Sequence, residues 1–259
     1  MGALYDRIGG SYARSRRADP GIVQALAGLL RPLRSGTYLD LGCGTGSYTV
    51  ALNALGGTWS AVDVSGTMLG QARAKTGEIG WIQASADALP FGDAVFDGAI
   101  CTLAIHHFPD LESAFAEVRR TLRAGPFVIF TGLAEQMRHY WLSHYFPDMM
   151  ACSIEKMPSE RQVRAALNRA GFRSVALTPF FVTNALQDLF LYSGKHRPEL
   201  YLDPALRANM SSFSSLVTAA ELEDGLARLV ADLRSGAFAA VQARHVSALG
   251  DYAYLCARP

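Results

Sequence analysis

The sequence predicts an α/β protein with a Rossmann-like, doubly wound and mostly parallel sheet. Short apolar runs rich in strand-forming residues alternate with helical patterns from Thr37 to Thr131, which is typical of a parallel sheet with helices on both faces. A glycine-rich loop at 42–46 follows the first run and opens a helix, as in nucleotide-binding sheets. Further strand patterns near 174–179 and at 251–257 bring the predicted strands to seven.

The periodicity of the sequence predicts the elements of the core in turn. The first five strands are expected at 37–41, 58–64, 80–84, 95–103 and 126–131. Apolar side chains recur at helical spacing in three of the intervening segments, 47–55, 68–75 and 111–122. We expect these three segments to be crossover helices.

The pattern changes after Gly132. Residues 133–157 are rich in aromatic side chains and methionine and show no strand pattern. We therefore expect a mostly helical cover over 133–216, interrupted by one core strand near 174–179. Capping-box pairs, Ser159 with Gln162 and Thr218 with Glu221, each predict the start of a helix. Residues 217–259 are expected to add a C-terminal helix and the last strand, completing the core.

Composition and charge argue against several classes of function. The 259-residue chain is 50% hydrophobic and 18% charged, with a formal net charge of +1. It carries no run of basic residues that would mark a nucleic-acid partner. No apolar stretch is long enough to span a bilayer, and the four cysteines form no CxxC pair. We expect a cytoplasmic protein with a small-molecule partner, without a metal, a nucleic-acid partner or a membrane association.

The strongest functional signal is LDLGCGTG at 39–46. Gly42, Gly44 and Gly46 lack a Cβ atom and are expected to let a nucleotide-like ligand approach the backbone. A dinucleotide fingerprint, GxGxxG, would place its third glycine at Ser47, so the sequence disfavours a pyrophosphate. The alternative is a sharp strand-to-helix turn that binds nothing.

Two carboxylates complete a pattern that suits an adenosine. Asp63 ends the second strand, where a carboxylate can accept hydrogen bonds from both ribose hydroxyls. Asp87 follows the third strand and can accept a hydrogen bond from the adenine amino group, while the backbone amide of Ala88 meets a ring nitrogen. An ordinary surface turn is the alternative for Asp87.

In order and spacing, these motifs resemble the class I S-adenosylmethionine-dependent methyltransferases, and within them the UbiE-like or type 11 group. The resemblance covers about the first 135 residues and rests on LDLGCGTG at 39–46, VDVSGTML at 62–69, ADALPF at 86–91, FDGAICTLAIHHF at 96–108, EVRRTLRAGPFVIF at 117–130 and YDRIGGSYARSRRADPGI at 5–22. Pro126 departs from the family, in which a second glycine usually follows Gly125. The resemblance implies N-terminal lid helices over 1–36, a cofactor-binding core over 37–132 and an antiparallel last strand.

The resemblance also implies roles for individual residues. Asp40 and Gly42 would hold the methionine amino end of S-adenosylmethionine, and Met68 would pack on an adenine face. An arginine of the lid, Arg16 or Arg17, would pair with the methionine carboxylate, although Arg17 fits a solvated basic run equally well. The full set of expected cofactor-binding residues is Tyr5, Tyr12, Arg17, Asp40, Gly42, Gly44, Gly46, Asp63, Val64, Met68, Ala86, Asp87, Ala88 and Thr102.

Three histidines are candidates for proton transfer. Methyl transfer is an in-line displacement from a sulfonium, so a base is needed only when the acceptor must lose a proton. His107 and His106 follow the fourth strand, near the expected transfer point, and either is a candidate base or a structural residue. His144 lies in a stripe of aromatic and methionine side chains, Tyr140 to Met150, that is either core or substrate pocket.

The expected function is therefore transfer of a methyl group from S-adenosylmethionine to an oxygen, nitrogen or carbon atom of a small molecule. One alternative is a catalytically retired protein that binds the cofactor in a regulatory or scaffold role. The other is a nucleotide-dependent oxidoreductase, which Ser47 and the alternate glycines disfavour.

Overall fold

The computed structural model describes residues 16–31 and 35–259. These residues separate into two compact units. The first contains the described residues before 132, together with 161–178 and 253–259, and the second contains 132–160 and 179–252. Each unit is described by itself.

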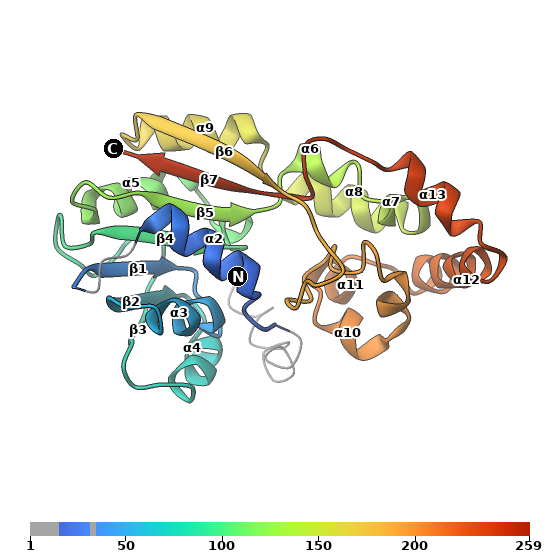
Figure 1. Ribbon diagram of the computed structural model, residues 1–259, viewed down its shortest axis with the longest axis horizontal. Coiled ribbons are helices and arrows are strands. Elements are labelled where there is room, and N and C mark those ends of the chain that lie inside the picture. The colour runs from blue at the N-terminus through green and yellow to red at the C-terminus, as the bar shows by residue number, and fades with distance from the viewer. Residues whose placement is uncertain (1–15, 32–34) are drawn as a thin grey trace. The chain divides into compact units, whose positions relative to one another are not determined.

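Seven strands form one sheet in the order β3-β2-β1-β4-β5-β7-β6 (Figure 1). Their bounds are Thr37–Leu41 for β1, Thr58–Asp63 for β2, Gly80–Gln83 for β3, Gly98–Thr102 for β4, Phe127–Thr131 for β5, Ser174–Phe180 for β6 and Tyr252–Arg258 for β7. The pairs β1–β2, β2–β3, β1–β4 and β4–β5 are parallel, and β7 runs antiparallel to β5. The predicted seven-stranded, mostly parallel sheet with an antiparallel last strand is confirmed.

Backbone hydrogen bonds at both ends of β7 show how it joins β6. The N–H of Arg173 donates to the carbonyl of Arg258 at 2.8 Å, and the N–H of Asp251 donates to the carbonyl of Phe180 at 2.8 Å. The start of β6 is thus paired with the end of β7, and the end of β6 with the start of β7, as in an antiparallel pair. β7 is therefore antiparallel to both of its neighbours.

Helices cover both faces of the sheet, as a doubly wound fold requires (Figure 1). The helices α2 (Pro20–Leu30), α3 (Ser47–Asn53) and α4 (Gly66–Arg73) lie on one face, and α5 (Leu111–Thr121) and α9 (Glu160–Arg169) lie on the other. Asp110 caps α5 by accepting hydrogen bonds from the N–H groups of Glu112 and Ser113. Phe115 of α5 then meets Phe127 of β5 edge to face, with ring centroids 5.5 Å apart.

The order of the strands decides where a ligand can bind. The chain moves outward in one direction from β1 to β3 and then returns to the other side of β1 with β4. The carboxyl ends of β1 and β4 thus meet at a switch point, where loops diverge and leave room for a ligand. The glycine loop follows β1, and the short helix η1 (Ile105–His107) follows β4.

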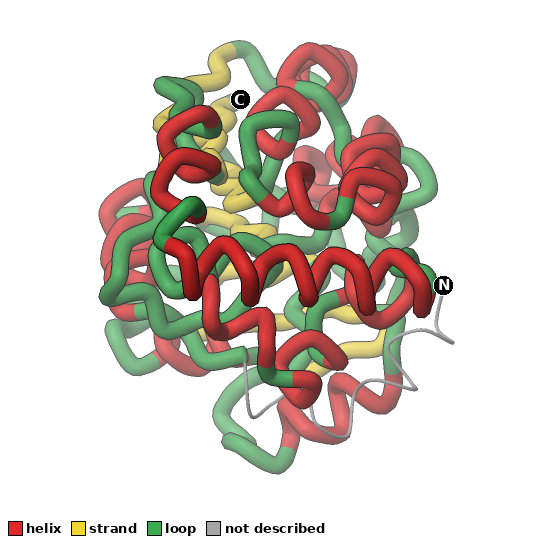
Figure 2. The backbone as a smooth tube through the Cα atoms, turned by 90° about the vertical axis from the view of Figure 1, so that its right-hand side faces the viewer, coloured by secondary structure: helices red, strands yellow, loops and turns green. Residues whose placement is uncertain are grey.

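The second unit is helical. It contains α6 (Ala134–Met137), α7 (Leu142–Tyr145), α8 (Pro147–Lys156), η2 (Pro198–Leu202), α10 (Pro204–Ala208), α11 (Ser211–Ser215), α12 (Ala219–Ser235) and α13 (Phe238–Arg244). The long α12 crosses the front of the view in Figure 2. Thr218 caps it as predicted, its hydroxyl accepting from the N–H of Glu221 at 3.2 Å. Among the described residues, no helix has both the length and the apolar character needed to cross a membrane.

The limits of the second unit differ from the predicted cover of 133–216. The helix expected to complete the core, α12, packs in the second unit, because Gly225 lets it approach Phe146 so closely that a Cβ atom would stand 2.4 Å from the phenyl ring. Asp232 also accepts a hydrogen bond from the hydroxyl of Tyr145 at 2.8 Å. Of residues 217–259, only the last strand from residue 253 onward belongs to the first unit.

Candidate active site

The glycine loop has a left-handed backbone at all three of its glycines. The φ angles are +71° at Gly42, +54° at Gly44 and +71° at Gly46, and side-chain-bearing residues rarely adopt this conformation. A Cβ atom on Gly42 would lie 2.6 Å from that of Ala104, and one on Gly46 would lie 2.3 Å from the ring of Trp81. On Gly44 it would meet nothing within 4 Å.

The three glycines therefore differ in what surrounds the position of a Cβ atom, although each was expected to make room for a ligand. Gly42 and Gly46 are needed because protein side chains pack against them. Of these three glycines, only Gly44 borders open space left by the described residues. Ser47, the residue that disfavours a dinucleotide, donates its hydroxyl to the carbonyl of Arg16 at 3.1 Å and accepts from Nζ of Lys75 at 2.9 Å.

Asp63 ties the end of β2 to the glycine loop. Its Oδ2 accepts the N–H of Gly44 at 2.8 Å, and its Oδ1 accepts the N–H of Ser65 at 2.8 Å. Burial raises the pKa of Asp63, and these backbone donors oppose that shift. The carboxylate is thus held in one orientation at the switch point, with lone pairs left for further donors.

Asp40 lies at the carboxyl end of β1 and is only 2% exposed. Its Oδ2 accepts the hydroxyl of Thr49 at 2.5 Å, whereas its Oδ1 is buried without a hydrogen-bond partner among the described residues. Burial raises the pKa of Asp40 to about 7, the charge of Asp63 adds to the rise, and the Thr49 hydrogen bond opposes it. A buried carboxylate oxygen with no partner is costly unless a ligand donates to it.

The residues expected near an adenine lie after β2 and β3. Val64 is 56% exposed and offers an apolar surface, whereas Met68 is 2% exposed and packs inside the first unit. Asp87 is exposed in a turn, and the neighbouring Ala86 is half-buried. The N–H of Ala88 already donates to the carbonyl of Ser85 at 3.2 Å.

The chain turns sharply where β4 ends. Leu103 adopts a left-handed conformation with φ of +54°, and its N–H donates to the carbonyl of Phe130 at 2.7 Å. A leucine in this conformation is strained, and such strain gathers at functional sites. The preceding residue, Thr102, keeps its Oγ1 buried without a hydrogen-bond partner among the described residues.

The two adjacent histidines of η1 lie against each other. The ring centroids of His106 and His107 are 3.9 Å apart. The Nδ1 of His106 is buried and has no hydrogen-bond partner in the described part of the chain. Burial lowers the pKa of His106 well below its usual value, and the charges of His107 and Arg16 lower it further. His106 is therefore a neutral imidazole at neutral pH.

The expected lid residues are only partly described. Tyr5 and Tyr12 lie outside the described residues. Arg17 is exposed, whereas Arg16 is half-buried and close enough to His106 to affect its pKa. Arg16 therefore lies near His106, and the expected contact of Arg17 with the methionine carboxylate stays a prediction.

His144 belongs to the second unit. It contacts Tyr145 edge to face at 4.8 Å, and burial together with the charges of Arg228 and Arg244 lowers its pKa. The aromatic and methionine residues around it are core of that unit: Tyr140, Trp141, Tyr145, Phe146, Met149 and Met150 are each at most 1% exposed.

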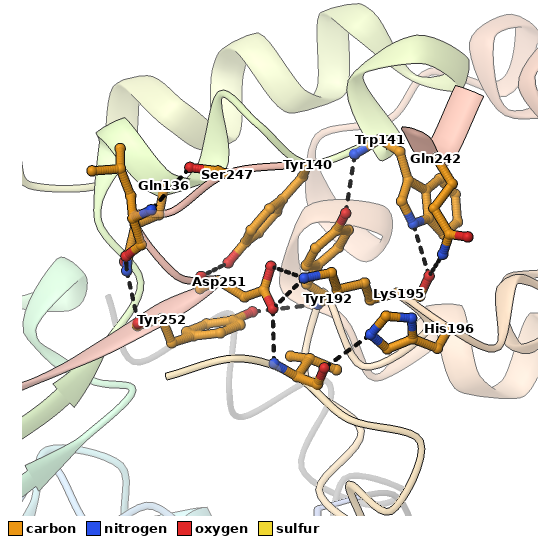
Figure 3. Close-up of polar contacts among 12 residues, drawn as sticks. Gln136, Tyr140, Trp141, Tyr192, Lys195, His196, Gln242, Ser247, Asp251 and Tyr252 are labelled. Atoms are coloured by element: carbon orange, nitrogen blue, oxygen red, sulfur yellow. Dashed lines mark hydrogen bonds and ion pairs between the residues drawn. The ribbon is translucent and has the colours of Figure 1, made fainter. Parts of the chain in front are cut away.

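A buried polar network that the sequence did not predict joins distant segments of the second unit (Figure 3). Nζ of Lys195 binds both carboxylate oxygens of Asp251 at 2.8 and 2.7 Å. The same carboxylate accepts the N–H of Val182 at 2.7 Å. Tyr140 stacks on Tyr192 with ring centroids 3.7 Å apart. No local pattern marks this network, because Lys195 and Asp251 are 56 positions apart.

Comparison with known proteins identifies the family. The family described as "Methyltransferase domain", type 11, matches residues 39–130. A malonyl-[acyl-carrier protein] O-methyltransferase of Salmonella typhimurium is 30% identical over 190 residues, which are 72% of this chain and 74% of the relative. The chain belongs to the class I S-adenosylmethionine-dependent methyltransferases, in their type 11 group. The family and the cofactor predicted from the sequence are confirmed.

Two further similarities support the assignment to this methyltransferase family. A UbiE ubiquinone/menaquinone biosynthesis C-methyltransferase of Brucella anthropi is 27% identical over 56% of this chain and 66% of its own length. A crystal structure from Anabaena variabilis, described as a candidate methyltransferase of an antibiotic biosynthesis pathway, superposes with a TM-score of 0.84, at 33% identity over 94% of this chain and 98% of that one. The chain spans about half the length of several other curated relatives.

The residues at the switch point fit S-adenosylmethionine. The unpartnered Oδ1 of Asp40 suits the ammonium group of S-adenosylmethionine. The open space beside Gly44 admits a ligand against the backbone, and the exposed Val64 offers an apolar surface for a base. Among the described residues, no three side chains of the histidine, cysteine or carboxylate type are arranged to hold a metal ion.

Proposed function

We propose that this chain transfers the methyl group of S-adenosylmethionine to an oxygen, nitrogen or carbon atom of a small molecule in the cytoplasm. The observation that carries the proposal is the buried Oδ1 of Asp40, which has no hydrogen-bond partner among the described residues, on a strand that leads into the glycine loop with its open position 44. The relatives named above are, by their names, an O-methyltransferase of malonyl-[acyl-carrier protein] and a C-methyltransferase of ubiquinone and menaquinone biosynthesis. The near-neutral charge of this chain fits an acceptor without a long polyanionic backbone.

The proposed cofactor contacts follow from the groups left available at the switch point. Asp40 accepts the ammonium group through Oδ1, and Asp63 accepts the ribose hydroxyls while Gly44 and Ser65 hold its carboxylate. The exposed Asp87 meets the adenine amino group, as the sequence predicts, and the N–H of Ala88 meets a ring nitrogen by exchanging its present acceptor, the carbonyl of Ser85, for the ligand. Bound in this way, S-adenosylmethionine supplies an electrophilic methyl group on a sulfonium.

The chain's own contribution to the chemistry is alignment and, where the acceptor is protonated, removal of a proton. Thr102, the last residue of β4, lies beside Gly42, because Asp40 is paired with Ile100 two residues earlier in both strands, and Leu103 follows it. We assign the base to His107, since the buried and neutral His106 would have to carry a positive charge without a described hydrogen-bond partner at Nδ1. His144 enters no step of this proposal.

Two measurements test the proposal. Calorimetry is expected to show binding of S-adenosylmethionine and S-adenosylhomocysteine but not of NAD, and Asp40→Asn is expected to weaken both cofactor forms. Incubation with methyl-labelled S-adenosylmethionine and a metabolite extract is expected to label a small molecule, whose mass increases by one methyl group for each transfer. Label found only on protein or RNA, or tighter binding of NAD, would overturn the proposal.

A further inference from the structure

The side chain that contacts Asp40 comes from the first helix after the glycine loop. Thr49 lies on α3 and is completely buried. Its hydroxyl donates to Oδ2 of Asp40 at 2.5 Å. The threonine therefore fixes one oxygen of the carboxylate and leaves the other, Oδ1, without a described partner.

The surroundings of Asp40 otherwise oppose its negative charge. Asp63 on β2 brings a like charge, and Cys43 of the glycine loop and Cys101 of β4 are thiols whose pKa values burial and the charge of Asp40 raise. The thiols of Cys43 and Cys101 are therefore uncharged at neutral pH, and neither provides a positive charge near Asp40. Among the described side chains that affect Asp40, Thr49 is the one that stabilises its ionised form.

We infer that Thr49 is a positioning residue for the cofactor: its hydroxyl holds the Asp40 carboxylate turned so that Oδ1 receives the ammonium group. The inference rests on the proposed role of Asp40. A carboxylate without this donor would take up a proton more readily and could rotate about its Cβ–Cγ bond. Both changes weaken the recognition of the amino-acid end of the ligand and leave the adenosine end unaffected.

The test compares two ligands that differ at the amino-acid end. S-Adenosylhomocysteine carries the ammonium group, whereas 5′-methylthioadenosine has the same thioadenosine without it. Thr49→Val keeps the shape of the side chain and removes the donor. It is expected to weaken S-adenosylhomocysteine roughly tenfold at pH 7, the lower range for a hydrogen bond to a charged group. The affinity for 5′-methylthioadenosine is expected to stay within about twofold of the wild-type value, since the adenosine contacts do not involve Thr49.

The pH dependence separates positioning from a general packing defect. The difference in S-adenosylhomocysteine affinity between the wild type and Thr49→Val is expected to be smaller at pH 9 than at pH 7, because Asp40 ionises in both proteins at pH 9. Titration of the ligand amine affects both proteins equally and therefore does not change this comparison. Thr49→Ser keeps the hydroxyl and is expected to restore the selectivity for S-adenosylhomocysteine. Should Thr49→Val fold poorly, Thr49→Cys provides a weak donor of similar size and is expected to give an intermediate loss.

Equal weakening of both ligands by Thr49→Val, or no change in either, would overturn the inference. Asp40→Asn, measured alongside, tests the function on which it rests. If this variant binds S-adenosylhomocysteine as tightly as the wild type does, the proposed role of Asp40 fails. If Asp40→Asn loses affinity and Thr49→Val does not, the role of Asp40 stands and the role of Thr49 is wrong.

Discussion

The carboxylate of Asp63 accepts the backbone N–H of Gly44 at 2.8 Å and so joins β2 to the glycine loop. Its second oxygen accepts the N–H of Ser65 at 2.8 Å, at the start of α4. A residue expected from the sequence to bind a ribose therefore also shapes the loop that admits the ligand. The two roles can be separated by measuring binding and stability on the same variants.

Asp63→Ala is expected to weaken S-adenosylhomocysteine by about 1.5–3 kcal/mol, the range for hydrogen bonds to a charged group. The melting temperature is also expected to fall, because the N–H groups of Gly44 and Ser65 lose their acceptor. Calorimetry and thermal unfolding check both effects. Asp87→Ala, in an exposed turn, serves as a control whose stability should be unchanged. Unchanged affinity in Asp63→Ala would show that the residue is structural alone.

Gly42→Ala and Gly44→Ala form a matched pair. The new methyl group would lie 2.6 Å from Ala104 in the first variant and in open space in the second. We expect Gly42→Ala to be strongly destabilised, whereas Gly44→Ala should lose only about 1–2 kcal/mol from its left-handed backbone. Gly44→Ala should nevertheless bind the cofactor poorly, because its methyl group occupies the ligand's space. Urea unfolding and calorimetry separate the two outcomes, and normal binding by Gly44→Ala would contradict the placement of the ligand.

The stability of the ligand-free protein is expected to depend on the ionisation of Asp40. Its pKa is raised from 3.8 to about 7 on folding, so the folded state holds this proton more tightly than the unfolded state does. The resulting stabilisation is complete below about pH 4 and is lost as the pH rises through about 7, and it is of the order of 4 kcal/mol at most. Urea midpoints at pH 5 and pH 8 measure it. In Asp40→Asn the side chain cannot ionise, so the free energy of unfolding should change less between pH 5 and pH 8 than it does in the wild type. The same pH dependence in both proteins would contradict the prediction.

The ion pair of Lys195 and Asp251 is expected to hold the second unit together (Figure 3). Asp251→Ala leaves a mostly buried ammonium group and the N–H of Val182 without their acceptor, which should cost about 3–5 kcal/mol. The double variant Lys195→Met with Asp251→Asn should be less destabilised than the sum of the single changes, because no buried charge remains. Additive losses in urea unfolding would show that the pair contributes nothing as a pair.

The fold and the cofactor were predictable because their signals are local. Strand and helix patterns, and the spacing of LDLGCGTG from Asp63, are read along the chain without knowledge of distant contacts. The packing of Trp81 against Gly46 joins residues from different elements. The sequence therefore did not reveal that Trp81 packs against Gly46, and the expected contact of Gly46 with the cofactor stays a prediction.

The second unit was less predictable for the same reason. The placement of α12 depends on the close approach of Gly225 to Phe146, which are 79 positions apart (225 − 146) in the sequence. The hydrogen bond from Thr49 to Asp40 is nearer in sequence, but nothing in the residue types says that the hydroxyl points at the carboxylate. Contacts of this kind depend on the tertiary structure and on rotamers, which the hydrophobic pattern does not encode.

His107→Ala is expected to lower turnover far more than it lowers cofactor affinity. The histidine lies in η1, directly after the strand that ends at Thr102. General base catalysis contributes roughly 10²–10⁴-fold, so kcat on the true acceptor should fall by about that factor while the S-adenosylhomocysteine dissociation constant stays nearly constant.

His106→Ala is the matched comparison for the assignment of His107 as the base. The two rings lie 3.9 Å apart, so removing His106 disturbs the packing of His107 but leaves the base in place, and we expect a smaller loss of kcat with a larger loss of thermal stability. The pH profile adds a second criterion. If the base must be neutral to act, kcat falls at acidic pH, and this acidic limb should disappear in His107→Ala but persist in His106→Ala. A normal kcat in both variants, or losses of kcat that follow thermal stability alone, would show that neither histidine acts as a base. Alignment of the acceptor with the methyl group would then account for the rate, which suffices for an acceptor that is already nucleophilic.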